Sequence, residues 1–237
     1  KFITIFYLKT KLALDTKYLI SPEISNFNKF RPKLRIAILA SGEGSNFLNL
    51  LKLSFKKELD IEIKILITNN GEAGCIKKAE NFNIPYLVLK EKNFISKEIY
   101  EREIINKLNE NQIELVVLAG WMKIITKQFI NEFKNRIINI HPSLLPSFKG
   151  RKAIQDALIH KVHFTGCSVH FVEEEVDSGK LIIQAVLPIS KDDNEVSLIK
   201  KVHSLEYEIL PYGISEAGFF IRNNFKDKNM NNSILYS

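Results

Sequence analysis

The sequence is poor in cysteine and contains no long apolar run. Only Cys75 and Cys167 are present, and neither belongs to a C-x-x-C pair or to a Cys/His spacing typical of zinc sites. We therefore predict a cytoplasmic protein in a reducing compartment, without a structural metal. No apolar run approaches the roughly 18 residues of a membrane-spanning helix, so no membrane partner is expected.

The positive charge is placed unevenly along the chain. The formal net charge is +7, and residues 1–34 hold seven Lys or Arg and two Asp or Glu, which gives this segment +5. A basic protein often binds nucleic acid through clustered Lys and Arg. Here the excess lies in a leader and the part that follows is nearly neutral. We therefore predict no nucleic-acid partner.

The composition divides the chain into three segments. Residues 1–33 begin with Lys1 rather than Met, and their apolar run Phe2–Leu8 is not followed by a cleavage site. We therefore predict a disordered basic leader rather than a targeting peptide. Residues 34–222 are predicted to form one large domain, in a chain long enough to bury about 70% of its unfolded surface. Residues 223–237, which are rich in Asn and Lys, are predicted to be a flexible tail.

From residue 33 onward, stretches typical of strands alternate with stretches typical of helices. The predicted strands are Leu34–Ala40, Ile61–Thr68, Ile84–Leu89, Ile113–Ala119 and Ile137–Ile140, and the predicted helices are Phe47–Phe55, Glu72–Asn83 and one from the capping residue Ser96 to about Gln112. This alternation predicts a doubly wound, mostly parallel sheet of the Rossmann-like α/β class.

The C-terminal part has a different pattern. The two apolar stretches Gly166–Val172 and Leu181–Leu187 flank an acidic loop, so we predict an antiparallel extension of the sheet. Asp192-x-x-Glu195 is then predicted to form a capping box that opens a last long helix.

The loop Ser41-Gly-Glu-Gly-Ser-Asn46 joins the first strand of the domain to its first helix. Its glycines let the backbone approach a ligand, and a helix N-terminus offers free N–H groups, so a phosphate is the expected guest. The loop lacks the lysine of a P-loop, and Phe47 stands where a dinucleotide fingerprint has its third glycine. A monophosphate remains, with Ser45 and Asn46 adding side-chain hydrogen bonds. A plain tight turn is the alternative interpretation.

A pair of polar residues stands near the end of the strand that leads to Pro142. Asn139 and His141 are two positions apart, so strand geometry places both side chains on the same face of the sheet. An amide donor beside an imidazolium can stabilise an oxyanion that forms only in a transition state. A buried carboxylate such as Asp177 could hold the histidine protonated. The alternative is an Asn turn and a structural histidine at a strand end.

Four motifs in this order give the chain a resemblance to a known family. They are the Ser41–Asn46 loop, Ala119-Gly-Trp-Met-Lys-Ile-Ile125, Asn139-Ile-His-Pro-Ser-Leu-Leu-Pro146 and Gly166-Cys-Ser-Val-His-Phe-Val172. From about Leu34 to about Arg222 the chain resembles the phosphoribosylglycinamide formyltransferases. The resemblance implies transfer of a formyl group from 10-formyltetrahydrofolate, as co-substrate, to the amine of 5-phosphoribosylglycinamide in purine synthesis. It also implies small-molecule substrates, no metal, and a monomer or homodimer.

The resemblance assigns roles residue by residue. The catalytic trio matches Asn139, His141 and Asp177, of which the first two would stabilise a tetrahedral oxyanion. The ribotide-binding residues match Gly44, Ser45, Asn46, Met122, His203 and Glu206. The folate-binding residues match Lys97, Met122, Lys123, Ile124, Ile125, Asn139, Glu173, Glu174, Glu175, Val176 and Asp177, largely through backbone groups.

Two positions depart from the pattern that the resemblance leads us to expect. Lys97 matches a position where an arginine near the folate is expected, so the charge is kept but the bidentate fork is lost. Glu43 stands in the phosphate loop at a position expected to be neutral. Its carboxylate must point to solvent, or it would weaken phosphate binding. His170 has two interpretations, as a packed neighbour of the site or as a participant.

Three alternatives stay open on the sequence. Methionyl-tRNA formyltransferases share the His-Pro-Ser-Leu-Leu-Pro run but would bring a further C-terminal domain, for which this chain is too short. Formyltetrahydrofolate deformylases would bring an N-terminal regulatory domain and are expected to have His in place of Pro142. A non-catalytic folate- or nucleotide-binding module is the third alternative, and the intact catalytic trio argues against it.

Overall fold

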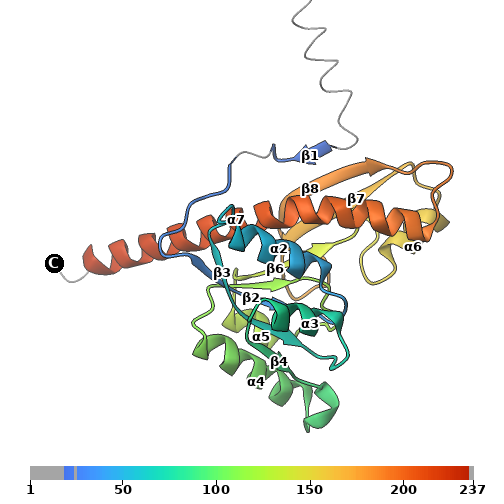
Figure 1. The fold of residues 1–237 in the computed structure, drawn as a ribbon. Helices are drawn as coiled ribbons and strands as arrows, with labels where there is room; N and C mark the ends of the chain where they lie inside the picture. Colours follow the sequence, from blue (N-terminus) through green and yellow to red (C-terminus); the bar gives the residue numbers. More distant parts are fainter. Residues whose placement is uncertain (1–18, 24–25, 235–237) are drawn as a thin grey trace, which may run out of the picture.

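A computed structural model describes residues 19–23 and 26–234, which contain one eight-stranded sheet in the order β1-β8-β7-β6-β5-β2-β3-β4 (Figure 1). The strands are β1 (Leu19–Ser21), β2 (Leu34–Leu39), β3 (Ile61–Thr68), β4 (Tyr86–Val88), β5 (Leu115–Leu118), β6 (Ile137–His141), β7 (Phe164–Phe171) and β8 (Leu181–Pro188). Strands β6, β5, β2, β3 and β4 are parallel, whereas β7, β8 and β1 join them antiparallel. The predicted fold class, a mostly parallel sheet with an antiparallel extension, is confirmed.

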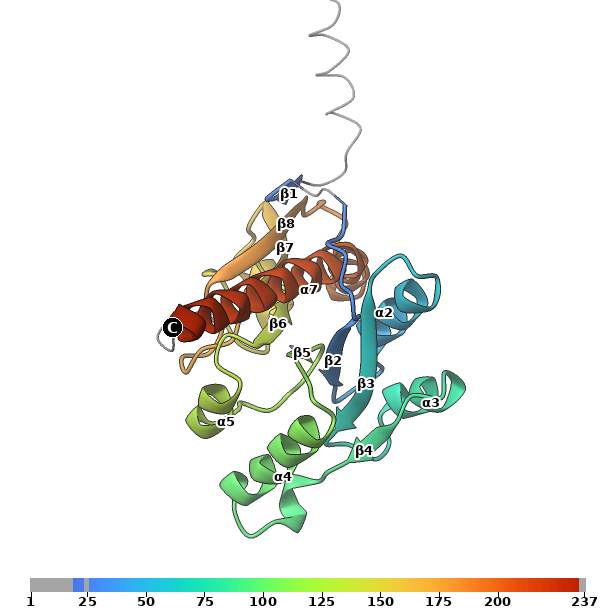
Figure 2. The same ribbon diagram turned by 90° about the vertical axis from the view of Figure 1, so that its left-hand side faces the viewer.

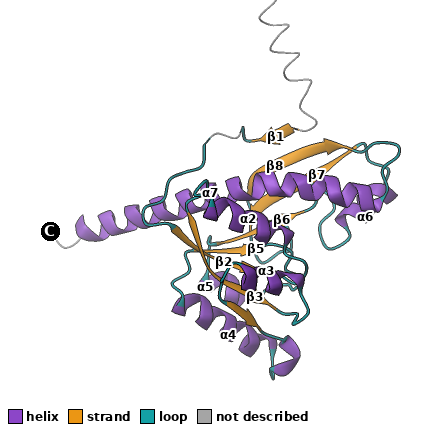
Figure 3. Ribbon diagram, in the orientation of Figure 1, coloured by secondary structure: helices purple, strands orange, loops and turns teal. Residues whose placement is uncertain are grey.

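Helices cover both faces of the sheet (Figures 2 and 3). They are α2 (Ser45–Phe55), α3 (Gly74–Asn81), α4 (Lys97–Glu110), α5 (Lys127–Glu132), α6 (Ala153–Ile159) and α7 (Glu195–Ile234), with the 3-10 turn η1 (Glu91–Asn93). Along β2, Ile36 and Ile38 pack in one core with α2, α3 and α7, whereas Ala37 and Leu39 pack in a second core with α4 and α5. Burial on both faces explains why the parallel strands are continuous apolar runs in the sequence.

Helix α7 lies against α2 and contains a proline (Figure 1). Pro211 has no N–H, so the carbonyl of Tyr207 one turn earlier lacks its usual helical partner. The Asn49 side chain of α2 donates a hydrogen bond to that carbonyl at 2.8 Å. The helix therefore continues through the proline, and this bond ties α7 to α2.

The N-terminal leader is partly a packed element, which corrects the prediction of disorder for residues 1–33. Strand β1 pairs with the edge of β8. The ring of Phe27 lies 4.4 Å from that of Tyr212, and Phe30 is buried in the core. The prediction rested on the start at Lys1 and the lack of a targeting signal. It did not weigh these two aromatic residues, which bury apolar area against the domain. Residues 1–18 lie outside the described residues.

The last helix begins and ends differently from the prediction. Asn194 and Ser197 form the reciprocal cap, because each side chain accepts a hydrogen bond from the other's backbone N–H at 3.0 Å. The predicted box of Asp192 and Glu195 is therefore wrong. The helix reaches Ile234, within the segment predicted to be a flexible tail. Glycine and proline, the residues that most readily end a helix, are absent from the sequence after Gly218.

Asn28→Ala is expected to lower the free energy of unfolding by about 1–2 kcal/mol. The Asn28 side chain donates to Ser215 Oγ at 3.1 Å and to Glu216 Oε1 at 2.8 Å. Ser215 is almost fully buried, so it would lose a partner that water cannot replace. Urea denaturation measures the change, with the exposed Asn131→Ala as the control. Equal stability of Asn28→Ala and the wild type would show that the Asn28 side chain adds nothing to the stability of the fold.

Candidate active site

A cavity of about 430 Å³ lies at the carboxyl ends of β2, β5 and β6. This volume is in the range of small-molecule sites. The residues proposed from the sequence that line it are Gly44, Ser45, Asn46, Met122, Lys123, Ile124, Ile125, Asn139, His141, Glu173, Glu174, Val176, Asp177, His203 and Glu206. Segments far apart in the chain therefore meet at one site.

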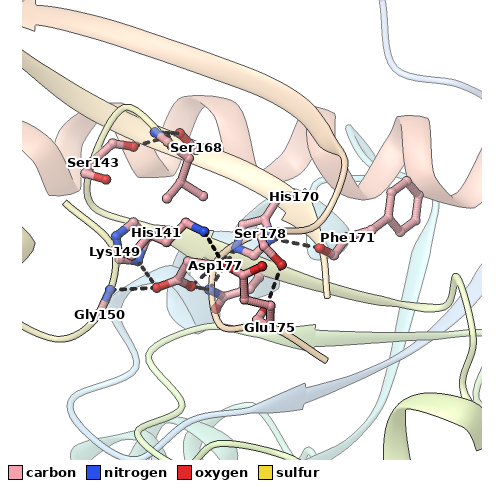
Figure 4. Close-up of polar contacts among 12 residues, drawn as sticks. His141, Ser143, Lys149, Gly150, Ser168, His170, Phe171, Glu175, Asp177 and Ser178 are labelled. Atoms are coloured by element: carbon pink, nitrogen blue, oxygen red, sulfur yellow. Dashed lines mark hydrogen bonds and ion pairs between the residues drawn. The ribbon is translucent and has the colours of Figure 1, made fainter. Parts of the chain in front are cut away.

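Asn139, His141 and Asp177 form a polar cluster in the wall of this cavity. Figure 4 shows His141 and Asp177 side by side. Strand β6 carries Asn139 and His141 two positions apart, as the sequence predicts. Asp177 comes from the loop after β7, and its Oδ2 lies 3.4 Å from His141 Nδ1. Its Oδ1 lies 3.5 Å from Asn139 Nδ2. The structure thus brings the three residues into one cluster.

The loop that carries Asp177 has a constrained backbone. Asp177 has a φ of 51°, in the left-handed region that Asp tolerates better than most residues. Gly179 follows, and a Cβ there would lie 1.8 Å from the Phe171 carbonyl oxygen, so only glycine fits. The backbone N–H of Gly150 donates to Asp177 Oδ2 at 2.8 Å. Backbone geometry and this hydrogen bond together fix the direction of the carboxylate.

Both ring nitrogens of His141 face acceptors. Nε2 lies 2.8 Å from the Phe148 carbonyl oxygen, and Nδ1 faces the Asp177 carboxylate. Burial lowers the pKa of His141, while the carbonyl and the carboxylate act in the opposite direction because they favour the doubly protonated ring. Burial alone would raise the pKa of Asp177, but it lies below its ordinary value because of the nearby His170 ring, the Gly150 N–H and the His141 ring. The pKa of His141 stays below its ordinary value overall, and Asp177 is an ionised carboxylate facing its Nδ1.

The glycine-rich loop ends at the N-terminus of α2. Gly44 has a φ of 67°, and a Cβ there would lie 2.5 Å from the Cys75 Cβ, so a larger residue cannot replace it without a shift. No side chain caps α2, and its first turn contains no acidic residue. Its first N–H groups therefore remain available to an anion in the cavity.

Glu43 points away from this loop, as the sequence analysis requires. Its side chain is 85% exposed, and its carboxylate lies 3.6 Å from Lys78 Nζ. The negative charge is thus directed to solvent and to a lysine of α3. Glu43 still lines the cavity, but the lysine offsets its charge near the start of α2.

Helix α7 brings Glu206 and His203 to the wall of the cavity. Glu206 is buried, and its Oε2 accepts a hydrogen bond from Asn46 Nδ2 at 2.8 Å. Burial raises the pKa of Glu206 to about 7, and the Asn46 bond opposes this rise. The Oδ1 of Asn46 is buried and has no hydrogen-bond partner among the described residues. This orphaned acceptor fits a hydroxyl or amine donor on a bound molecule.

The segment Met122–Ile125 forms the opposite wall. The Met122 N–H donates to Ser41 Oγ at 3.0 Å, and its carbonyl accepts from Arg151 Nη2 at 2.9 Å. The side chains of Met122 and Ile124 are more than half exposed, although both are apolar. Apolar side chains held at the mouth of a cavity can cover the ring of an aromatic ligand.

Two proposed residues lie elsewhere. Lys97, at the start of α4, and Glu175 are not among the residues that line the cavity. The Glu175 carboxylate is 2.7 Å from Lys149 Nζ and is largely exposed. Glu175 can serve only through the loop that it shares with Asp177, which agrees with the expectation of backbone contacts.

Arg151 and His170 are among the lining residues that were not assigned to the site from the sequence. Arg151 follows the β6 strand-end loop, and its contact with Met122 joins two loops whose approach no local pattern indicates. His170 was left between two interpretations, and its position opposite Asn139 on the neighbouring strand places it at the catalytic cluster. A histidine on a buried strand was the available signal.

Two further searches cover only the part of the chain that the structure describes. Within it, no group of three or more His, Cys, Asp or Glu side chains is arranged to hold a metal ion. None of the helices in that part is both long and apolar enough to cross a membrane.

The chain is similar to formyl transferases in sequence. The family model described as "Formyl transferase" matches residues 34–214. The trifunctional purine biosynthetic protein adenosine-3 of Homo sapiens is 37% identical over 187 residues, which cover 79% of this chain and 18% of that protein. The protein of the same name from Chironomus tentans is 36% identical over 182 residues, 76% of this chain and 13% of that protein. The chain thus spans less than a fifth of the length of these relatives.

Solved structures of similar length agree in fold. Phosphoribosylglycinamide formyltransferase from Bacillus halodurans is 36% identical, with a TM-score of 0.75, and the match covers 77% of this chain and 94% of that one. Glycinamide ribonucleotide transformylase 1 from Geobacillus kaustophilus is 34% identical, with a TM-score of 0.75, and the match covers 78% and 98% of the two chains.

Proposed function

The chain belongs to the formyl transferase family, and we propose that it transfers a formyl group from 10-formyltetrahydrofolate to the amine of 5-phosphoribosylglycinamide in purine biosynthesis. One observation carries the proposal: a single cavity joins the free N-terminus of α2 to the cluster of Asn139, His141 and Asp177. A phosphate can bind at the helix while an amine at the other end of the same molecule reaches the cluster.

The residues around the cavity fit the two substrates. The first N–H groups of α2 would hold the ribotide phosphate. Glu206 and the orphaned Oδ1 of Asn46 would accept hydrogen bonds from the ribose hydroxyls or neighbouring N–H groups. The folate ring would lie against Met122–Ile125 and the loop that ends at Asp177. Formyl-folate supplies the activated one-carbon group. The side chains and backbone N–H groups of the cavity would orient the two substrates and stabilise the charge on them.

The reaction exchanges one C–N bond for another. The ribotide amine attacks the formyl carbon, the bond from that carbon to the folate nitrogen breaks, and the amine loses a proton that the folate nitrogen gains. Asn139 would donate a hydrogen bond to the formyl oxygen while negative charge develops on it. His141 would do so with its Nε2–H, in exchange for the bond to the Phe148 carbonyl. Asp177 would favour the protonated form of His141 against the effect of burial and would help to relay the proton, with water as a carrier.

Formyl transfer is tested with purified protein and 10-formyltetrahydrofolate, with and without 5-phosphoribosylglycinamide. Release of tetrahydrofolate should depend on the ribotide and should match the amount of formylated ribotide. Asp177→Asn is the control for contaminating activity. Equal release with water alone would favour a deformylase, and binding of both compounds without turnover would favour a non-catalytic module.

Asn46→Ala is expected to raise the KM for the ribotide roughly tenfold, because the loss of one hydrogen bond weakens binding by about this factor. Asn46 would contact the ribotide far from the formyl carbon, and it also holds Glu206. These contacts change little between ground and transition states, so kcat and the folate KM should stay nearly constant.

Steady-state kinetics with each substrate varied in turn measures the effect of Asn46→Ala. Asn81→Ala, an exposed change on α3, is the matched control. A collapse of kcat at saturating ribotide, or an unchanged ribotide KM, would show that Asn46 does not serve ribotide binding in this way.

A further inference from the structure

His170 lies beside the catalytic cluster but has no role in the reaction described above. It is buried on β7 and stands directly opposite Asn139 in the antiparallel register with β6. We propose that His170 is a positioning residue, which fixes the orientation of the Asn139 amide through its own tautomer. This inference rests on the proposed function, because it concerns how Asn139 is kept as a hydrogen-bond donor for formyl transfer.

The tautomer of His170 follows from its first partner. Its Nδ1 lies 2.7 Å from the carbonyl oxygen of Phe171. A carbonyl oxygen only accepts hydrogen bonds, so Nδ1 must carry the hydrogen (Figure 4). In the neutral ring the second nitrogen, Nε2, then has a lone pair. Nε2 also lies 3.6 Å from Asp177 Oδ1, so a second hydrogen on the ring would pair with that carboxylate instead of leaving Nε2 as an acceptor. The backbone of β7 therefore makes Nε2 an acceptor in the neutral ring.

That acceptor selects one orientation of the Asn139 amide. Asn139 Nδ2 lies 3.2 Å from His170 Nε2 and 3.5 Å from Asp177 Oδ1. In the flipped amide, the oxygen of Asn139 would face a lone pair and a carboxylate oxygen, and both contacts would be repulsive. His170 and Asp177 therefore keep the nitrogen of Asn139 on their side.

This orientation matters for the transition state. The amide nitrogen carries two hydrogens, so one can stay on His170 Nε2 while the other is donated to the formyl oxygen. His141, the second proposed donor, also contacts Asp177, through its Nδ1. His170 thus keeps a donor rather than an acceptor at the place where negative charge develops.

Two substitutions separate the two contacts of His170. In His170→Asn the side-chain amide can replace Nδ1 and donate to the Phe171 carbonyl, but it does not reach Asn139. In His170→Gln the longer side chain can place its carbonyl oxygen near the position of Nε2 and accept from Asn139. If His170 had only a structural role, His170→Asn would lose less activity than His170→Gln, because the asparagine variant keeps the hydrogen bond to the Phe171 carbonyl within β7.

We expect His170→Asn to lower kcat about tenfold, the value of one hydrogen bond of this kind, with both KM values unchanged. His170→Gln should recover most of this loss. In the background of Asn139→Ala, His170→Asn should have no further effect on kcat. Equal losses in the two His170 variants, an additive loss in the double variant, or an unchanged kcat in His170→Asn would each overturn the proposal.

A measurement on the wild type covers the case in which a variant does not fold. Nitrogen-15 NMR of the histidine rings should give a His170 ring with hydrogen on Nδ1 and not on Nε2. The opposite tautomer would overturn the proposal without any substitution. Absence of ribotide-dependent formyl transfer by the wild type would instead refute the proposed function, whatever the tautomer.

Discussion

Asp177→Asn is expected to lower kcat by roughly three orders of magnitude, as when the orienting carboxylate or an oxyanion donor of another enzyme is removed. Asp177 Oδ2 accepts from the Gly150 N–H and faces His141 Nδ1. An asparagine of the same shape cannot ionise, so it cannot stabilise the imidazolium. The KM values and the thermal stability should change little, because the shape of the loop is kept.

The same cluster predicts a non-additive double variant. If Asp177 acts through His141, then His141→Ala in the Asp177→Asn background should add little to the loss in kcat. Single-turnover kinetics at saturating substrates measures the loss. Independent, multiplicative losses would show that the two residues do not act as one unit. Glu174→Gln, at a lining residue whose carboxylate pairs with Lys127, is a control for charge loss in the same loop.

The parallel part of the fold could be predicted because its signals are local. β2 was predicted as Leu34–Ala40 and is found at Leu34–Leu39, since a strand buried on both faces is a continuous apolar run. The Ser96 cap was also predicted, and its side chain accepts a hydrogen bond from the Ile99 N–H at the start of α4.

Other elements carry weaker local signals. α5 has six residues, and its buried Phe129 and Ile130 are adjacent, so no helical period is visible. β1 is three residues long and depends on the edge of β8, which is distant in the sequence. Both elements are set by tertiary contacts rather than by propensity.

The candidate site also contains residues that local sequence patterns indicate and residues that only tertiary contacts bring together. Asn139 and His141 could be paired from the two-residue period of a strand. Asp177 could be added only through the family resemblance, because its approach depends on the left-handed backbone at that residue and on Gly179. The contact of Arg151 with the Met122 carbonyl depends on the path of two loops. The partner of His170 depends on strand register, which the sequence did not specify.

The buried carboxyl of Glu206 is expected to make the stability of the protein depend on pH. Burial raises its pKa from 4.5 to about 7 in the folded protein. The pKa of Glu206 is higher in the folded protein than in the unfolded one. The neutral carboxyl therefore stabilises the fold relative to the ionised carboxylate, and this contribution is fully present below pH 4.5. It is lost as the pH rises through 7. The shift corresponds to about 3 kcal/mol at most, since each pKa unit is worth roughly 1.4 kcal/mol.

Glu206→Gln removes this dependence, because glutamine is neutral at every pH and can still accept from Asn46 Nδ2. The variant should match the wild type near pH 4.5 and exceed it by up to about 3 kcal/mol at pH 8. Urea denaturation at both pH values measures this. The exposed Glu72→Gln is the control. A constant difference between Glu206→Gln and the wild type across this range would mean that Glu206 is not buried as a titrating group.

The stability gained in Glu206→Gln should be accompanied by weaker ribotide binding. An ionised Glu206 is a stronger acceptor for ribose hydroxyls than a neutral amide, because hydrogen bonds to charged groups are roughly twice as strong as neutral ones. We therefore expect a higher ribotide KM at pH 8 with kcat nearly unchanged. A variant that is both more stable and equally tight in binding would show that the carboxylate of Glu206 does not bind the ribotide.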